Sequence, residues 1–189
     1  ERYVLGMRNS GAEQTGAFIL DALGIDYANK FNLAYMGYGA SASALQDGNI
    51  VGMNVPAGAP VTSITQAYAQ LAGRMRVLNF SQQEMDAVNA QYPLWDFYDL
   101  APGTYPYQDE VVTTASSPNV FVVRDDVPEE IVYQLTRLLW DNLATLQEIH
   151  SATKQMSIED ALKGNPIPLH PGALRYYQER QIDIPDHLF

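Results

Sequence analysis

Cysteine is absent from this chain of 189 residues. Disulfide bonds, thiolate catalysis and cysteine-based metal sites are therefore excluded, and cysteine usage says nothing about the redox compartment. Histidine is also scarce, and the three histidines, His150, His170 and His187, lack the i, i+4 spacing of a helical metal-binding pair. The sequence therefore predicts neither a metal site nor another cofactor.

Basic residues are few, with 11 Lys and Arg against 22 Asp and Glu and a formal net charge of −11. Binding to nucleic acid or to an anionic membrane surface requires clustered Lys and Arg, so this balance argues against both. An anionic ligand would need donors that are concentrated locally.

Long apolar runs are missing too. No stretch approaches the roughly 18 to 20 apolar residues of a membrane span, and no secretory signal pattern is present. The chain nevertheless opens directly on a run typical of a buried strand. We therefore expect that the N-terminal part of a longer protein, with any signal peptide, precedes Glu1.

The first two dozen residues have the pattern strand, turn, helix. Residues 3–5 are a short apolar run, residues 6–11 are a polar turn, and apolar residues then recur at helical spacing up to Leu23. A helix that begins beyond the carboxyl end of a strand directs unpaired N–H groups and its positive dipole end at a ligand, which favours an anion. Ser10-Gly-Ala-Glu13 is also a capping box, which satisfies the same N–H groups. Local sequence leaves both interpretations open.

The first half continues with the same alternation. We expect strands at residues 31–36, 50–55 and 75–80, a helix at residues 40–46, and a helix with Pro60 in its first turn that carries Ile64, Ala67, Tyr68 and Leu71. This pattern predicts βαβ units and a largely parallel sheet. Three loops, at residues 6–13, 37–40 and 54–60, should converge at the carboxyl ends of its strands, either as a ligand site or simply as turns.

The second half is less regular. Ser81 to Glu84 form a capping box that opens a helix to about Gln91, and residues 93–108 are an aromatic-rich, irregular segment that lines a pocket or packs a hinge. Residues 111–114 and 120–123 are strand-like.

Helices are expected near the end of the chain. A long helix with Pro128 in its first turn should be a core helix, a short capped helix should span residues 157–162, and a last helix should begin at Pro171 with His170 at its entry. The apolar stripe of the long helix consists of Ile131, Leu135, Leu138, Leu139, Leu143, Leu146 and Ile149.

Catalytic motifs are absent. Ser10 does not lie in a nucleophile elbow, and no Walker loop occurs. The carboxylates at positions 125, 126, 129 and 130 are placed as cap and dipole residues rather than as an acid/base pair. Arg8 is the more informative charge, because a guanidinium in the turn could grip a carboxylate bidentately, although a solvated turn arginine explains it equally well.

Three stretches together resemble the TAXI family of solute-binding receptors for tripartite ATP-independent periplasmic (TRAP) transporters. They are Ser10-Gly-Ala-Glu13, Ala101-Pro-Gly-Thr-Tyr105 and Pro166-Ile-Pro-Leu-His-Pro-Gly-Ala-Leu-Arg-Tyr-Tyr177. Weaker matches are Ala44-Leu-Gln-Asp-Gly48, Gly58-Ala-Pro60 and Val127-Pro-Glu-Glu-Ile-Val-Tyr133, so that the resemblance spans nearly all of residues 6–180, as the later part of a typical member.

The resemblance implies an α/β chain with the type II periplasmic-binding-protein fold, in which two lobes close on a ligand. Residues 1–100 would be mainly the second lobe, and residues 101–189 would hold the crossover or hinge strands, the long helix and the C-terminal helices. The N-terminal lobe would be missing. The resemblance implies a periplasmic or extracytoplasmic receptor, for which the missing part could supply a lipid anchor. Such a receptor captures a small organic acid or an amino acid such as glutamate and delivers it to a membrane permease, without catalysis.

On this resemblance, ligand-binding residues would be Arg8, Ser10, Gly11, Ala12, Glu13, Asn54, Gly58 and either Tyr105 or Tyr107. Two departures stand out: Ala12 replaces a usual threonine, and Ile50-Val51-Gly52 replaces a usual Ile-Asp-Ala. A ligand-sensing input domain of a signalling system with the same fold is the alternative function. An enzyme on such a sheet is disfavoured because no catalytic constellation is present.

Overall fold

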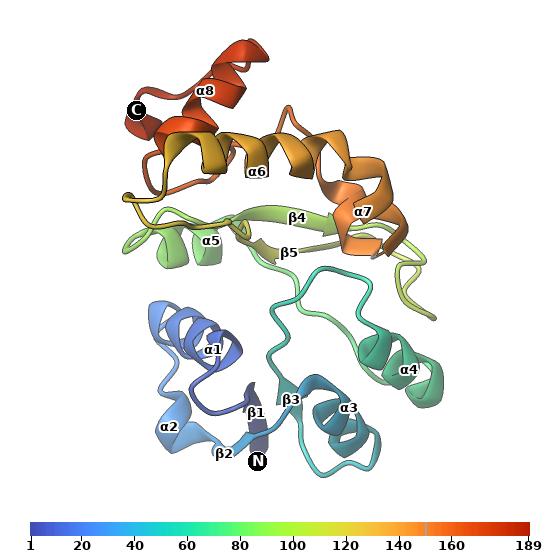
Figure 1. Cartoon of the computed structure of the whole chain (residues 1–189). Coiled ribbons are helices and arrows are strands. Elements are labelled where there is room, and N and C mark those ends of the chain that lie inside the picture. Colours follow the sequence, from blue (N-terminus) through green and yellow to red (C-terminus); the bar gives the residue numbers. More distant parts are fainter. Residues whose placement is uncertain (150) are drawn as a thin grey trace. The chain divides into compact units, whose positions relative to one another are not determined.

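The structure, a computed structural model, describes residues 1–149 and 151–189 (Figure 1). The chain divides into two compact units, which we call unit 1 (Glu1–Ser116) and unit 2 (Ser117–Phe189). The division falls after Ser116, and the assignment of residues 1–100 to a second lobe stays a prediction.

Unit 1 contains a three-stranded parallel sheet of order β2-β1-β3, made of β1 (Arg2–Gly6), β2 (Asn32–Tyr35) and β3 (Gly52–Met53). Helices α1 (Gly11–Ala22) and α2 (Tyr27–Lys30) connect β1 to β2, and α3 (Tyr38–Gln46) connects β2 to β3. This confirms the predicted βαβ organisation and the α/β fold class. The chain passes from β1 to β2 on one side of β1 and then crosses to β3 on the other side. Right-handed crossovers therefore put α1 and α3 on opposite faces of the sheet (Figure 1). The carboxyl ends of β1 and β3 therefore form a topological switch point.

The predicted strand at residues 50–55 is shorter in the structure. Only Gly52 and Met53 are strand residues, although the flanking N–H groups of Val51 and Asn54 also donate to β1, to Arg2 O and Val4 O, both at 2.9 Å. The prediction of a strand at residues 75–80 was wrong. Its N–H groups bond individually instead, that of Val77 to the Tyr68 hydroxyl and that of Phe80 to Thr113 O, so no ladder forms.

Unit 1 also holds an antiparallel pair, β4 (Asp96–Leu100) and β5 (Val112–Ser116), so the prediction that residues 93–108 are irregular throughout was wrong. Helix α5 (Gln82–Asn89) begins with the predicted capping box of Ser81 and Glu84. Helix α4 (Thr62–Leu71) starts after Pro60, which is therefore not in its first turn. Its apolar face, Ile64 and Tyr68, packs with Leu100 and Tyr105 in the core.

The predicted long helix of unit 2 is two helices, α6 (Glu129–Asp141) and α7 (Leu143–Ile149), with Pro128 as the N-cap and Asn142 as the C-cap of α6. The side-chain amide of Asn142 donates to Leu138 O at 2.7 Å, which satisfies a terminal carbonyl group where α6 ends. The description of this segment as a core helix was wrong. Three residues of its apolar stripe are about half exposed: Ile131 51%, Leu135 43% and Leu138 52%.

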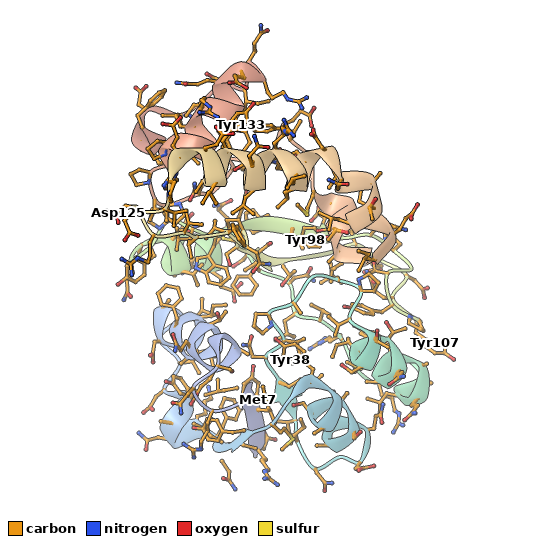
Figure 2. All side chains as sticks on the ribbon, viewed as in Figure 1. Met7, Tyr38, Tyr98, Tyr107, Asp125 and Tyr133 are labelled. Atoms are coloured by element: carbon orange, nitrogen blue, oxygen red, sulfur yellow. The ribbon has the colours of Figure 1, made fainter. Side chains whose placement is uncertain are left out.

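Helix α6 packs instead through its other side on α8 (Pro171–Glu179). Tyr133 lies between these helices (Figure 2) and meets Tyr176 edge to face. The approach is close, because a Cβ at Gly172 would lie 2.2 Å from Glu129 O. The core of unit 2 consists of Leu162, Tyr176, Tyr177 and Leu188.

The remaining described segments of unit 2 are short helices, turns and irregular chain. Short 3-10 helices span Ser151–Gln155 (η1) and Asp186–Leu188 (η2). Residues 120–123 are not a strand, and residues 157–162 form turns rather than the predicted helix, although Asp160 N–H does donate to Ser157 Oγ at 3.2 Å.

Candidate functional site

The turn between β1 and α1 is built around Gly6. Its φ of 131° lies in a region that other residues rarely adopt, and a Cβ there would lie 2.7 Å from the Ala12 Cβ. The end of the strand therefore passes directly against the first turn of the helix. Only glycine permits this contact, which fixes where α1 begins.

Ser10 is the N-cap of α1. Its hydroxyl accepts from Glu13 N–H at 3.2 Å and donates to Met7 O at 2.6 Å. The Glu13 carboxylate accepts from Asn9 N–H rather than from Ser10 N–H, which itself donates to Met7 O at 3.2 Å. The predicted capping box is thus confirmed for the hydrogen bond that the Ser10 hydroxyl accepts. The Glu13 carboxylate, however, bonds the N–H group of Asn9, one residue before the position that a capping box uses.

Two N–H groups remain at this helix start, those of Gly11 and Ala12. As the first two helical residues they have no intrahelical acceptor, and in the described part of the chain no hydrogen bond joins them to another residue. Gly11 is exposed, and a Cβ built on it would meet nothing within 4 Å. These two N–H groups are the ones that an anion at this helix end would contact.

Arg8 stacks on an aromatic ring. Its guanidinium carbon lies 3.9 Å from the centroid of Tyr35, the last residue of β2, and it forms no ion pair among the described residues. Arg8 is also exposed, so this contact is compatible with a solvated turn arginine, and the bidentate contact with a carboxylate stays a prediction. The planar face is engaged by the ring, and the N–H groups at its edge keep their capacity to donate.

Asn54 holds the helix start in place. Its side-chain amide donates to Ala12 O at 2.7 Å, and its main-chain N–H donates to Val4 O at 2.9 Å. Gly16 permits this, because a Cβ at that position would lie 2.8 Å from Asn54 Nδ2. Asn54 therefore connects the end of β3 to α1 across the switch point.

The three predicted loops do converge, and a contact joins each pair. The loop after β1 meets the loop after β2 where a Cβ at Gly37 would lie 3.8 Å from Met7 Sδ. Asn54 joins the first loop to the third. The Tyr38 hydroxyl joins the second to the third by donating to Pro56 O at 3.2 Å. Met7 and Tyr38 are labelled in this part of unit 1 in Figure 2.

Gly58 and Tyr105 belong to the surroundings of this site. Gly58 is exposed in the third loop. Tyr105 is 4% exposed, stacks on Tyr68 at 5.1 Å between centroids, and accepts from Val61 N–H at 3.2 Å. Burial raises the pKa of Tyr105, opposed by that hydrogen bond. Tyr105 thus anchors the end of the third loop from the core.

Tyr107 lies elsewhere. It is 62% exposed, has a φ of 63°, and its Cβ lies 3.7 Å from where a Cβ of Gly73 would be, just past the carboxyl end of α4. Figure 2 shows it beyond α4 and away from Met7. The structure therefore brings together the predicted residues at positions 8, 10–13 and 54, and leaves Tyr107 outside this group.

Sequence reasoning missed Met7, Tyr35 and Tyr38. Met7 and Tyr38 lie within predicted turns and Tyr35 lies shortly before one, and the Gly37-Tyr-Gly39 pattern around Tyr38 was the available signal. A large residue between two glycines, just after a strand, projects from a loop in which the backbone itself occupies little space.

The other candidate residues have structural partners. His170 is the N-cap of α8, with Nδ1 accepting from Gly172 N–H at 3.2 Å and Nε2 lying 2.9 Å from Val127 O, so the predicted helix-entry role is confirmed. Arg175 pairs with Glu129 and Glu130 at 2.7 Å, and its hydrogen bond, with that of Gln134, lowers the pKa of Glu130. His150 lies outside the described residues, and the described ones hold no cluster of three or more potential metal ligands.

A comparison with protein families identifies the family of this chain. The model of the NMT1-like family matches residues 1–180. The chain belongs to the NMT1-like family. This is a periplasmic solute-binding family related to the TAXI receptors, and its members bind ligands rather than catalyse reactions. None of the described helices of this NMT1-like chain has the length and apolar character needed to cross a bilayer.

Proposed function

We propose that this chain forms part of an extracytoplasmic receptor that captures a small carboxylate-bearing solute, an amino acid or an organic acid such as glutamate, and delivers it to a TRAP-type permease. The observation that carries the proposal is the pair of donors, Gly11 and Ala12 N–H, at the topological switch point of the sheet. Family membership supports solute binding, and the resemblance to TAXI receptors supports the transporter partner.

The ligand carboxylate would accept from both of these N–H groups at the positive end of the α1 dipole. Ser10 has both hydroxyl functions engaged in the cap and acts by fixing the helix start. Ala12 contributes only its backbone, because no hydroxyl is present at that position. Arg8, held on Tyr35 beside this turn, would add positive charge.

The negative charge of Glu13 affects which carboxylate ligands this site can bind. Its negative charge lies in the first turn of α1, bound to Asn9 N–H, and would repel a ligand that carries only negative charges. An α-ammonium group next to the ligand carboxylate would offset this repulsion. The site is therefore better suited to an amino acid than to the matching dicarboxylic acid.

The decisive experiment is isothermal titration calorimetry on the full-length protein with a panel of amino and dicarboxylic acids, including glutamate and glutarate, which lacks the ammonium group. Gly11→Pro removes one N–H donor at a helix position where proline is tolerated, and we expect binding to weaken by roughly 10- to 100-fold, the value of one charge-assisted hydrogen bond.

Gly11→Ala is the matched control, because it keeps the N–H group and its Cβ meets nothing within 4 Å. Its affinity should stay within a factor of about three of the unmodified protein. Equal affinities of the proline and alanine variants would rule out this helix start as the carboxylate site. Tighter binding of glutarate than of glutamate would overturn the role given to Glu13.

A further inference from the structure

Helix α1 and the loop that follows α5 meet through three aromatic side chains. The Phe18 ring of α1 stacks on Trp95 with 6.2 Å between the ring centroids, and its centroid lies 5.8 Å from that of Tyr92. All three residues belong to unit 1, in which α1 and α5 lie next to each other (Figure 1). Tyr92 is 59% exposed, and Phe18 and Trp95 are partly exposed. We call these three residues the aromatic surface.

The aromatic surface is held in position by α5. The Trp95 main-chain N–H donates to Asn89 Oδ1 at 3.0 Å, and the Trp95 carbonyl oxygen accepts from Asn89 Nδ2 at 2.9 Å. Asn89 is the last residue of α5, and Pro93 restricts the backbone between Tyr92 and Trp95. Aromatic side chains that are already ordered lose little conformational entropy on binding, and Trp and Tyr are residue types that often anchor protein interfaces.

The polar ends of Tyr92 and Trp95 are not used inside the protein. In the part of the chain that the structure describes, neither the Tyr92 hydroxyl nor the Trp95 indole N–H forms a hydrogen bond, and neither is among the buried unpaired atoms. Both groups therefore reach solvent. Each ring offers a partner an apolar body and a hydrogen-bonding tip.

The charge around the aromatic surface has one sign. No Lys or Arg occurs in residues 9–29 or 77–123, the two segments that contribute to it. Asp21 lies three residues after Phe18 on the same side of α1, and Asp86 lies in α5. Both aspartates are exposed, and neither forms an ion pair with another described residue. A cation that approaches the rings therefore meets negative charge with no competing arginine or lysine from these segments.

Charge complementarity identifies the occupant that fits this surface. Nucleic acid and anionic membranes are repelled, and a second copy of a chain with a formal net charge of −11 is repelled as well. A protein segment that carries Lys or Arg beside apolar residues fits on both counts. Its cations face the aspartates and can stack on the exposed Tyr92 ring, and its apolar side chains pack on the aromatic rings.

We propose that the aromatic surface of unit 1, with Asp21 and Asp86 at its rim, docks a basic, apolar segment of a partner protein. Tyr92 and Trp95 are the anchors, and the aspartates orient the segment. This interface does not rest on the carboxylate site at the start of α1, so either can fail without the other.

The test uses the amidated peptide Lys-Leu-Gly-Lys-Leu-Gly-Lys as the probe. One counterpart has Glu at the Lys positions, and a second keeps Lys but has Ser at the Leu positions. Heteronuclear NMR of the full-length protein follows the Trp95 indole N–H, identified as the signal that Trp95→Phe removes. We expect saturable shifts of this signal with the probe, at least about fivefold weaker binding of the Ser counterpart, and none with the Glu counterpart.

Two variants with matched controls locate the interface. Tyr92→Ala removes an anchor and should weaken the probe at least about fivefold, whereas Tyr107→Ala removes an equally exposed tyrosine elsewhere in unit 1 and should leave binding unchanged. Asp21→Asn combined with Asp86→Asn should weaken the probe about fivefold and reduce its salt dependence. Asp47→Asn combined with Asp183→Asn makes the same change in net charge at exposed positions outside these two segments, and should have a smaller effect.

Four results would overturn the proposal. They are the absence of a saturable shift at Trp95, equal binding of the probe and either counterpart, unchanged binding to Tyr92→Ala, and equal effects of the two double aspartate variants. Self-association of the protein that Tyr92→Ala abolishes would also overturn it, because the occupant would then be a second copy of the chain.

Discussion

The side-chain amide of Asn54 donates a 2.7 Å hydrogen bond to the main-chain carbonyl oxygen of Ala12. The two residues lie far apart in the sequence, one after β3 and the other in the first turn of α1. Their hydrogen bond fixes the helix start relative to the sheet. The orientation of the Gly11 and Ala12 N–H groups therefore depends on a side chain from another loop.

Replacing Asn54 tests this dependence. Asn54→Ala removes the donor and should lower the free energy of unfolding by about 1–2 kcal/mol. Asn54→Asp should cost more, because a carboxylate would face the Ala12 carbonyl oxygen. Urea unfolding monitored by circular dichroism measures both, with the exposed Asn119→Ala as control. Equal stability of the Asn54 and Asn119 variants would show that the hydrogen bond does not support the fold.

Gly6 should be the least replaceable residue of the turn. Gly6→Ala combines an unfavourable φ with a 2.7 Å clash against Ala12, and we expect a loss of about 2–4 kcal/mol. Gly39→Ala is the control: it lies at the start of α3 with nothing within 4 Å, and should be neutral or stabilising by up to about 0.5 kcal/mol. Thermal unfolding distinguishes them, and similar midpoints for the two variants would contradict the geometry at Gly6.

Tyr105 and Tyr107 should respond differently to loss of the hydroxyl group. Tyr105→Phe leaves Val61 N–H without its acceptor and should cost about 1–2 kcal/mol, while the stacking on Tyr68 survives. Tyr107→Phe alters an exposed side chain and should change stability by less than about 0.5 kcal/mol. Urea unfolding of the pair gives the comparison. A larger loss of stability for Tyr107→Phe than for Tyr105→Phe would show that Tyr105 is not the anchoring tyrosine.

The cap of α5 predicts an acid-dependent contribution to stability. The Ser81 N–H group, followed by its hydroxyl, lowers the pKa of Glu84 below the ordinary value of 4.5. The stabilisation is therefore present above pH 4.5 and is lost as the pH falls through the lower pKa of the folded state. Carboxyl-detected NMR titration should give a midpoint below 4.5, and Ser81→Ala should raise it. A midpoint that Ser81→Ala leaves unchanged would exclude the contribution of the hydroxyl group, while the backbone N–H group remains in this variant.

The sequence was most informative where the determinants are local. The β1–turn–α1 unit, the Ser81 cap and the start of α8 at His170 and Pro171 were all predicted, because each depends on residues within one helical turn. Glu13 illustrates the limit of such patterns. The capping-box motif identified the serine and the glutamate, but whether the carboxylate bonds Asn9 or Ser10 depends on the path of the turn.

Elements that depend on distant partners were harder to predict. Asp96 and Asp99 are poor strand residues, and β4 forms because it pairs with β5 and buries Leu100. The prediction for residues 75–80 was wrong in the opposite sense, because a strand was expected and none forms. Their apolar character suits a strand, but the Val77 N–H group is taken by the Tyr68 hydroxyl, and a ladder needs a free edge in the right register.

Helix α6 of unit 2 shows a third kind of limit on prediction from sequence. Periodicity predicted a helix with one apolar stripe, but it did not show which side of α6 would meet α8. Glycine at position 172 admits the α6 backbone at Glu129, so contact forms on the side of Val132 and Tyr133 while Leu135 and Leu138 remain exposed.

The stacked pair of Tyr68 and Tyr105 has a consequence for local opening. One hydroxyl receives the N–H group of Val77, which follows α4, and the other receives that of Val61, which precedes it. The segments before and after α4 are thus bonded to one aromatic stack, and Tyr68 in that stack belongs to α4 itself. The amide protons of Val61 and Val77 should therefore exchange with solvent at a common rate, as a single cooperative unit.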